Sequence, residues 1–288
     1  MSPVSIAEFR DRAVAVLTEV GILNAQIDAE LLIGHVVGLS RGEVQARAIT
    51  GATLSDDDLV VLSAALKRRA AREPLQHITG RAWFRSLELA VGPGVFVPRP
   101  ETEEVTQFAI DALRAVPSAA PVAVDLGTGS GAIAFSLATE VPQSLVYAIE
   151  KSPLAFPWTQ QNRELTGAAN ATVVLGDLAD AFPELDGTVD VVTSNPPYIP
   201  RDAVPRDPEV RLHDPEIALY GGEDGLDVVR QVSITAQRLL HPGGVLVLEH
   251  GELQGAAIAA LLRADGWVAV ATHPDLLGRD RATTALKH

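Results

Sequence analysis

The chain has 288 residues, of which 47% are hydrophobic and 21% are charged, so it is long enough for two domains with buried cores. Its formal net charge of −14 at pH 7 would repel bare nucleic acid unless a local basic stripe exists, and the sequence contains no such stripe. The absence of cysteine excludes disulfides and thiolate metal sites, and no metal site is predicted. Without a signal-peptide pattern or an apolar run of membrane-spanning length, we expect a cytoplasmic protein that binds no membrane.

Residues 1–73 are predicted to form a small N-terminal helical domain. Ser5 with Glu8, and Ser55 with Asp58, have the spacing of a capping box at the start of a helix. The segment 28–38, "DAELLIGHVVG", predicts a more buried helix between them. After the first capping box, apolar residues recur on one helical face at Ile6, Phe9, Ala13, Leu17 and Val20.

A basic cluster closes the last of these helices, at Lys67, Arg68, Arg69 and Arg72. One interpretation is that these cations complement the helix dipole, since Asp56 to Asp58 open the same helix. The other is a basic contact for RNA or for an RNA-bound partner. The sequence alone leaves both open.

Residues 74–100 are predicted to form a β-hairpin that links two domains, with apolar residues alternating on either side of Pro93-Gly94. Residues 101–288 then repeat a strand, loop and helix pattern. Their strands read as short apolar runs, which is typical of a mostly parallel sheet covered by helices on both faces. Ligands of such sheets bind beyond the carboxyl ends of the strands. Two edge strands are predicted near the C-terminus, in "WVAVAT" and "RATTALKH".

Three strand ends carry residues suited to a nucleoside. The first runs into "DLGTGSG", in which Gly127, Gly129 and Gly131 permit a tight turn before a helix. Glu150 ends the second strand, where a carboxylate can accept hydrogen bonds from both hydroxyls of a ribose. Asp177 ends the third, where it could meet the edge of an adenine. Each has a structural alternative: a tight turn for the glycines, a solvated acid for Glu150 and a turn or helix cap for Asp177.

The fourth strand ends in "NPPY". Asn195 and Pro196 each precede a proline and are held extended, while Pro196 and Pro197 have fixed φ and no N–H. The result is a stiff corner that presents two acceptors, the side-chain carbonyl of Asn195 and the backbone carbonyl of Pro196. Tyr198 supplies a flat face beside them. This arrangement suits a planar –NH₂ group that donates both hydrogens to the corner.

At these residues the sequence resembles the class I methyltransferases that use S-adenosylmethionine to methylate planar amino groups. The order of "PLQHITG", "VFVPRPETE", "NPPYIP", "YGGEDGLD" and "LEHG" after a helical domain resembles the HemK/PrmC family. The resemblance implies a Rossmann-like fold with a seven-stranded sheet. It also implies methylation of the side-chain amide nitrogen of the glutamine in the Gly-Gly-Gln motif of peptide chain release factors, which act in translation termination.

The same resemblance assigns residues. Asn195 to Tyr198 would bind the glutamine, with Asn195, Pro196 and Tyr198 as catalytic residues, and Pro98 to Glu103 ("PRPETE") would border the site. Thr102 and its neighbours could equally be a plain helix start. The N-terminal helices would dock the release factor. The residues implied to bind the cofactor are Gly127, Thr128, Gly129, Ser130, Gly131, Glu150, Asp177, Leu178 and Asn195.

Two features depart from the family pattern. Leu178 follows "GD" where family members often carry an aromatic residue. Pro153 fits a first helical turn, but Pro157 does not fit a helix interior, so the helix after Glu150 is predicted to start late or to be kinked. Both features bear on the adenine side of the cofactor.

Three alternative functions remain at this stage. A methyltransferase for an amino group of a DNA or RNA base would use the same corner, but it would require a basic track along the phosphates. A non-catalytic adaptor of the translation machinery would bind the cofactor without turnover. A nicotinamide dehydrogenase is disfavoured because the glycines are spaced G-x-G-x-G and not G-x-G-x-x-G.

Overall fold

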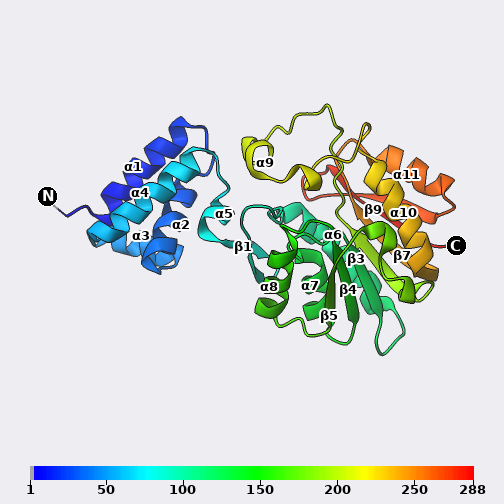
Figure 1. The fold of residues 1–288 in the computed structure, drawn as a ribbon. Helices are drawn as coiled ribbons and strands as arrows, with labels where there is room; N and C mark the ends of the chain where they lie inside the picture. Colours follow the sequence, from blue (N-terminus) through cyan, green and yellow to red (C-terminus); the bar gives the residue numbers. More distant parts are fainter. Residues whose placement is uncertain (1–2) are drawn as a thin grey trace. The chain divides into compact units, whose positions relative to one another are not determined.

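The computed structural model describes residues 3–288, which form two compact units (Figure 1). The first contains residues 3–80 together with 206–213, and the second contains residues 81–205 and 214–288. The short segment 206–213 therefore belongs with the N-terminal helices although it follows the "NPPY" motif in the chain. Within the described residues, no helix combines the length and the apolarity needed to cross a membrane.

The N-terminal unit is built from six helices of the described chain. Its core includes Phe9, Leu17, Ile33 and Leu62, all fully buried. The helices are α1 (Ile6–Glu19), α2 (Ala25–Val37), α3 (Arg41–Ile49), α4 (Asp56–Ala70), α5 (Leu75–Thr79) and α9 (Pro208–His213).

Helix starts in this unit follow from local sequence. The predicted capping boxes at Ser5 and Ser55 are confirmed, with both side chains accepting from the backbone three residues on. A third box at Ser40 with Glu43 begins α3, which the sequence analysis did not predict. Val20, predicted on the apolar face of α1, is instead a half-exposed residue at its C-terminus.

Two arginines of the basic cluster at the end of α4 form ion pairs inside the unit. Arg69 is buried and bridges Asp28, at 2.7 Å, and Glu209, at 2.9 Å, while Arg72 also contacts Glu209. These ion pairs hold α9 against the N-terminal helices. Two of the guanidinium groups predicted to face the helix dipole or RNA are therefore occupied by carboxylates.

The second unit opens with a hairpin of β1 (Arg81–Phe84) and β2 (Leu87–Ala90). Its turn lies at Arg85 and Ser86, so the predicted turn at Pro93-Gly94 is wrong. The alternating valines beyond β2 (Val91, Val95 and Val97) do not pair as a strand. They are buried in a small cluster with Trp158, which explains why their apolar pattern imitated one.

A seven-stranded sheet follows, in the order β5-β4-β3-β6-β7-β9-β8. Six strands share one direction, and only β9 runs antiparallel to its two neighbours, β7 and β8, as expected for the class I methyltransferase fold. The predicted C-terminal strands are confirmed, although β9 lies inside the sheet and only β8 is at its edge. The strands are β3 (Val122–Leu126), β4 (Leu145–Glu150), β5 (Ala171–Leu175), β6 (Val189–Ser194), β7 (Leu240–Glu249), β8 (Val268–Pro274) and β9 (Asp280–Leu286).

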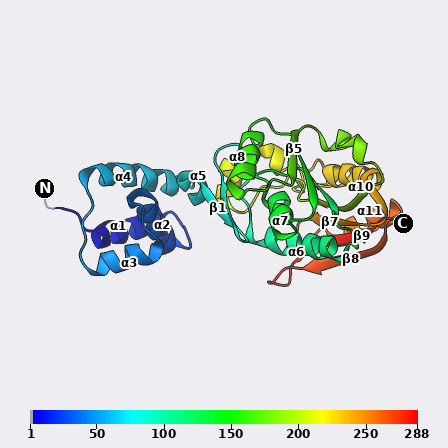
Figure 2. The same cartoon turned by 90° about the horizontal axis from the view of Figure 1, so that it is seen from below.

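Helices cover both faces of this sheet (Figures 1 and 2). On one face lie α6 (Pro100–Ala115), α7 (Ala132–Glu140) and α8 (Phe156–Thr166), and on the other α10 (Asp227–Leu239) and α11 (Gly255–Ala264). Short 3₁₀ turns, η1 (Leu178–Asp180), η2 (Pro183–Leu185) and η3 (Glu216–Ala218), complete the unit.

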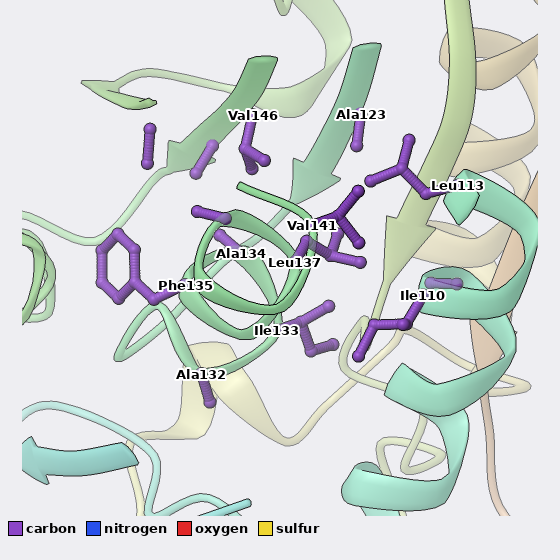
Figure 3. Close-up of a cluster of buried hydrophobic side chains, with 14 of the residues drawn as sticks. Ile110, Leu113, Ala123, Ala132, Ile133, Ala134, Phe135, Leu137, Val141 and Val146 are labelled. Carbon is purple, nitrogen blue, oxygen red and sulfur yellow. The ribbon is translucent and has the colours of Figure 1, made fainter. Parts of the chain in front are cut away.

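Successive strand residues face opposite cores, as the period of a strand requires. Ala123 packs with α6 and α7, whereas its neighbour Val124 packs with α10 and α11. Figure 3 shows α7 in the first of these cores, where Leu137 and Val141 lie in the same cluster as Ala123 of β3 and Leu113 of α6. The strands are buried on both faces, which is why they read as continuous apolar runs in the sequence.

The strand order places the switch point of the sheet between β3 and β6. From β3 the chain winds outward through β4 and β5, then crosses back to add β6 and β7 on the other side. Crevices at such switch points are the usual ligand sites of doubly wound sheets. Here β3 ends in the glycine loop and β6 ends in "NPPY", so the two motifs lie side by side.

Candidate active site

The glycine loop connects β3 to α7 and is held in a left-handed conformation. Gly127, Gly129 and Gly131 have φ angles of +76°, +59° and +85°, which residues with a side chain rarely adopt. A Cβ on Gly131 would also lie 2.0 Å from the ring of Phe135. Beside Gly127 and Gly129 there is open space, which leaves room for a ligand against the backbone.

The N–H groups of this loop are used to fix its own shape. Gly127 and Thr128 both donate to the carbonyl of Ile149 at 3.0 Å, and Gly131 donates to the carbonyl of Thr128 at 2.9 Å. Gly129 donates to Oε2 of Glu150 at 2.8 Å. These donors are therefore not free to bind a pyrophosphate, which argues against a dinucleotide site and suits a nucleoside without phosphate.

Glu150 ends β4 beside this loop and is almost fully buried. Its second oxygen, Oε1, accepts from the N–H of Ser152 at 2.6 Å. The two backbone bonds fix the carboxylate, and each oxygen retains a lone pair for a further donor. Glu150 is thus a positioned acceptor and not the solvated acid of the structural alternative.

Asp177 caps the 3₁₀ turn η1, because its Oδ1 accepts from the N–H of Ala179 at 3.0 Å. Its Oδ2 lies 2.8 Å from Nζ of Lys151. The bond with Lys151, and after it the bond from Ala179, lowers the pKa of Asp177, so this carboxyl is ionised at neutral pH. Leu178 begins η1 and packs against the core on the α10 side. The cap alternative for Asp177 is confirmed, whereas its contact with an adenine stays a prediction.

The helix after Glu150 starts late, as predicted. Ser152 accepts from the N–H groups of Leu154 and Ala155 in a preceding turn, and α8 begins only at Phe156. Pro157 is therefore in the first turn of α8, where a missing N–H has no cost.

Two buried polar side chains of α8, neither of which is predicted from the sequence, hold the glycine loop. Thr159 donates to the carbonyl of Gly129 at 2.6 Å. Asn162 donates to the carbonyls of Ser130 and Ala90, each at 2.9 Å, and accepts from the N–H of Ala90 at 2.6 Å. In the sequence, these two residues are marked only by being polar at positions on the buried face of the helix.

Asp125, also missed, joins the two motifs. Its Oδ2 accepts from Thr128 of the glycine loop at 2.6 Å, and its Oδ1 accepts from Thr193 of β6 at 3.0 Å. Burial raises the pKa of this carboxyl to about 6 despite these bonds. Ser194 adds a second link, since it donates to the carbonyl of Leu126 at 2.7 Å.

The "NPPY" corner follows β6 directly. Asn195 is half-buried and Pro196 is buried, and residues 3–288 provide no hydrogen-bond donor to Oδ1 of Asn195 or to the carbonyl of Pro196. The two acceptors predicted from the sequence are thus both unpaired. Burial, reinforced by the nearby charge of Glu249, raises the pKa of Tyr198 to about 12. Tyr198 is therefore a neutral phenol at physiological pH and not a proton acceptor.

The "YGGEDGLD" segment supports this corner from behind. Ile199 pairs with Tyr220 in a parallel bridge. Gly225 approaches so closely that a Cβ there would lie 2.3 Å from the carbonyl of Tyr198. The same carbonyl accepts from Nε2 of Gln254 at 2.9 Å. Gly221, where a Cβ would lie 2.4 Å from the carbonyl of Pro197, and Gly225 are thus explained by close packing on the corner, whereas Gly222 has a φ of +95° and faces Asp227.

"PRPETE" borders the corner, as predicted. Helix α6 begins at Pro100, so the segment is also a helix start. Thr102 is buried in its first turn, and Nδ2 of Asn195 donates to its Oγ1 at 3.5 Å. A separate surface hollow lined by Arg85, Ser86, Glu103 and Glu140 shares only Glu103 with this segment, and Arg85 already pairs there with Glu140.

Comparison with known proteins matches both halves of the chain. Residues 8–80 match the PrmC N-terminal domain and residues 118–271 a methyltransferase domain. The release factor glutamine methyltransferase of Streptomyces coelicolor is 50% identical over 94% of both chains. That of Bifidobacterium longum is 45% identical over 96% of this chain and 97% of its own. The chain belongs to the release factor glutamine methyltransferase family.

The chain is also similar to a protein that is named for a different substrate. A Streptomyces pristinaespiralis protein named 4-amino-L-phenylalanine/4-methylamino-L-phenylalanine methyltransferase is 41% identical over 99% of this chain and 96% of its own.

Two solved structures are similar to this chain in fold. A Pyrococcus furiosus methyltransferase has a TM-score of 0.52 at 21% identity, covering 70% of this chain and 90% of its own. The 16S rRNA N2 G1207 methyltransferase of Thermus thermophilus, solved with AdoMet and guanosine, also has a TM-score of 0.52, at 22% identity over 72% of this chain and 50% of its own.

Proposed function

We propose that this protein transfers a methyl group from S-adenosylmethionine to the side-chain amide nitrogen of the glutamine in the Gly-Gly-Gln motif of peptide chain release factors. The observation that carries the proposal is the pair of unpaired acceptors at Asn195 and Pro196, fixed beside the glycine loop. Full-length relatives named for this reaction support it. The N-terminal unit, matched to the PrmC N-terminal domain, is proposed to dock the release factor.

S-adenosylmethionine fits the residues at the ends of β3, β4 and β5. The open space beside Gly127 and Gly129 accommodates a ligand at the backbone, and Glu150 is held with lone pairs to spare for ribose hydroxyls. Asp177, with Leu178 beside it, would face the adenine. When bound, the cofactor supplies an electrophilic methyl group. Thr128 and Ser130 complete the loop residues assigned to it, and Asp125 links Thr128 to Thr193, two residues before Asn195.

The corner selects and orients a carboxamide. Its –NH₂ group donates one hydrogen to Oδ1 of Asn195 and the other to the carbonyl of Pro196, with Pro197 and Tyr198 forming the adjoining wall. Both hydrogens are then held in the amide plane. The nitrogen lone pair, which is perpendicular to that plane, is directed toward the neighbouring nucleoside site. Holding two reacting groups in line in this way can lower a barrier by roughly 7–11 kcal/mol.

Asn195 and Pro196 also stabilise the charge that grows on the nitrogen as it is methylated. No strong base is required beforehand, because the nitrogen loses its proton after it becomes cationic. The neutral phenol of Tyr198 agrees with this order of events. A hydroxyl or a carboxylate would leave an acceptor unpaired, at a cost of roughly 1–3 kcal/mol for each buried group.

The test is to incubate the protein with a release factor and methyl-labelled S-adenosylmethionine and to map the label by mass spectrometry. We expect one label on the Gly-Gly-Gln glutamine, and none on a release factor in which that glutamine is replaced by glutamate. Parallel reactions with 4-amino-L-phenylalanine and with RNA test the other substrate classes. Labelling of either in place of the release factor would overturn the proposal, as would cofactor binding without any turnover.

A further inference from the structure

A small array of buried polar side chains lies behind the corner. Thr102 comes from the first turn of α6, Glu249 from the end of β7, and Asn195 from the end of β6. Thr102 and Glu249 are 4% and 2% exposed. Nδ2 of Asn195 donates to Oγ1 of Thr102 at 3.5 Å. The carboxylate of Glu249 lies beside both side chains, close enough for each of them to lower its pKa.

The chemistry of these groups decides which of them donates and which accepts in each hydrogen bond of the array. An ionised carboxylate accepts hydrogen bonds and donates none, so the hydroxyl hydrogen of Thr102 is directed at Glu249. The oxygen of Thr102 can then only accept from Asn195. The –NH₂ side of the Asn195 amide must therefore face the array, and Oδ1 must face the opposite way, where no residue of 3–288 donates to it.

Resting on the proposed function, we propose that Glu249 is a positioning residue whose carboxylate, directly and through Thr102, fixes the Asn195 amide with its oxygen toward the substrate carboxamide. An asparagine amide is nearly symmetric in shape, so packing alone does not decide which end faces the substrate. If the Asn195 amide were reversed, its –NH₂ group would face the –NH₂ group of the substrate carboxamide. The corner would then lose one of its two acceptors.

The energetics of Glu249 favour a functional role over a packing role. Among the described residues, its Oε2 has no hydrogen-bond partner, and burial raises the pKa of the carboxyl to about 7. A buried acid with an unpaired oxygen destabilises the fold, and an apolar side chain would fill the same space at lower cost. Such costly groups gather at functional sites.

Several charged or titratable groups face Glu249. Arg281 of β9 lowers the pKa of Glu249, whereas Glu101 of α6 raises it. Tyr198, after β6, stays neutral because its own pKa is about 12, and burial lowers the pKa of His250, the next residue on the chain. Neither of these two groups gains or loses charge as pH rises from 7 to 9.

When Glu249 is protonated, the donor and acceptor roles in the array are no longer fixed. The carboxylic acid can donate, so the hydroxyl of Thr102 is no longer committed to it and can turn to Oδ1 of Asn195. The correctly oriented corner therefore predominates above pH 7 and is lost as the pH falls through about 7, which is where the folded-state pKa lies. Methyl transfer should follow the same curve.

The kinetic test compares wild type with Glu249→Gln, Thr102→Val and Thr102→Ser on a release factor between pH 6 and 9. We expect wild-type kcat to rise with a midpoint near pH 7 and the Glu249→Gln profile to lose that midpoint. At pH 8, Glu249→Gln and Thr102→Val should each lower kcat by about tenfold or more, the kinetic equivalent of one hydrogen bond. Thr102→Ser, which keeps the hydroxyl, should recover most of the loss.

Matched controls separate positioning from general damage. Thr106 lies one turn further along α6, is equally buried, and donates only to the backbone of Thr102 among the described residues. Thr106→Val should leave kcat and its pH profile unchanged. The dissociation constant for S-adenosylmethionine, measured by calorimetry, should change by less than about threefold in every variant.

A readout without turnover is the side-chain amide of Asn195 in ligand-free, ¹⁵N-labelled protein, identified as the signal pair missing from Asn195→Ala. Its chemical shifts should titrate with a midpoint near pH 7 in wild type and not in Glu249→Gln. Unchanged kcat and pH profile in Glu249→Gln, with wild type active on the release factor, would overturn the role of Glu249 alone. A wild type that methylates no release factor would instead overturn the proposed function.

Discussion

Three buried or half-buried side chains carry the proposed chemistry of the site. Asn195 is the proposed acceptor, Asp125 ties the glycine loop to the strand that leads to Asn195, and Tyr198, the proposed wall, stays neutral. The acceptor pair could be predicted from four letters of sequence, because proline geometry is local. The roles of Asp125 and Glu249 could not, since their partners are remote in sequence and only the fold brings them together.

Replacing Asn195 by alanine should separate turnover from cofactor binding. The variant loses one of two groups that hold the carboxamide and its growing charge, so kcat should fall by about 10²-fold or more. The dissociation constant for S-adenosylmethionine should stay within about threefold, because Glu150 and the glycine loop are intact. Equal losses in both quantities would refute the assigned role.

Glu249→Gln should stabilise the protein at alkaline pH. Burial raises the folded-state pKa to about 7 from an ordinary value of 4.5, so the fold favours the protonated acid and loses stability as pH rises from 4.5 to 7. The difference corresponds to roughly 3 kcal/mol. Urea unfolding should show the variant more stable than wild type by up to about that amount at pH 8, with little difference at pH 4.5. A variant less stable at pH 8 would contradict this.

The loops at the site take their shape from neighbouring elements as well as from their own glycines and prolines. Helix α8 fixes the carbonyls of the glycine loop through Thr159 and Asn162, and "YGGEDGLD" packs against the carbonyl side of the "NPPY" corner. The parallel strands were predictable because they are buried on both faces. The hairpin turn was misplaced because Val95 and Val97 alternate like a strand but are buried as a loop under Trp158.

Asn162→Ala should weaken cofactor binding, and Asn170→Ala should not. Both asparagines donate to more than one backbone carbonyl and sit in the same unit, but only Asn162 holds the glycine loop. Each variant should lose roughly 1–3 kcal/mol of stability. Calorimetry should show S-adenosylmethionine affinity reduced by about tenfold in Asn162→Ala alone. A similar loss in Asn170→Ala would mean that general loosening is responsible.

Over the chain as a whole, domain organisation was partly predictable. The helical N-terminal region and the sheet-containing remainder are evident from the change in apolar period. The sequence gives no sign that residues 206–213 fold with the N-terminal helices, because Glu209 meets Arg69 and Arg72 only in three dimensions. The hairpin predicted as a linker packs its Phe84 and Leu89 into the core of the second unit.

The net charge of −14 bears on the class of substrate. Since two arginines of the most basic segment are already paired with Glu209, we expect no retention on heparin at about 0.15 M salt. Retention under these conditions, with elution that shifts steeply with salt, would favour a nucleic acid substrate over a protein one.

The most direct measurement is a structure of the complex with S-adenosylhomocysteine and a release factor domain that carries Gly-Gly-Gln. The glutamine nitrogen should lie at about 2.9 Å from both Oδ1 of Asn195 and the carbonyl of Pro196, with its free face toward the cofactor sulfur. A glutamine held elsewhere, or with its carbonyl oxygen against these two acceptors, would contradict the account.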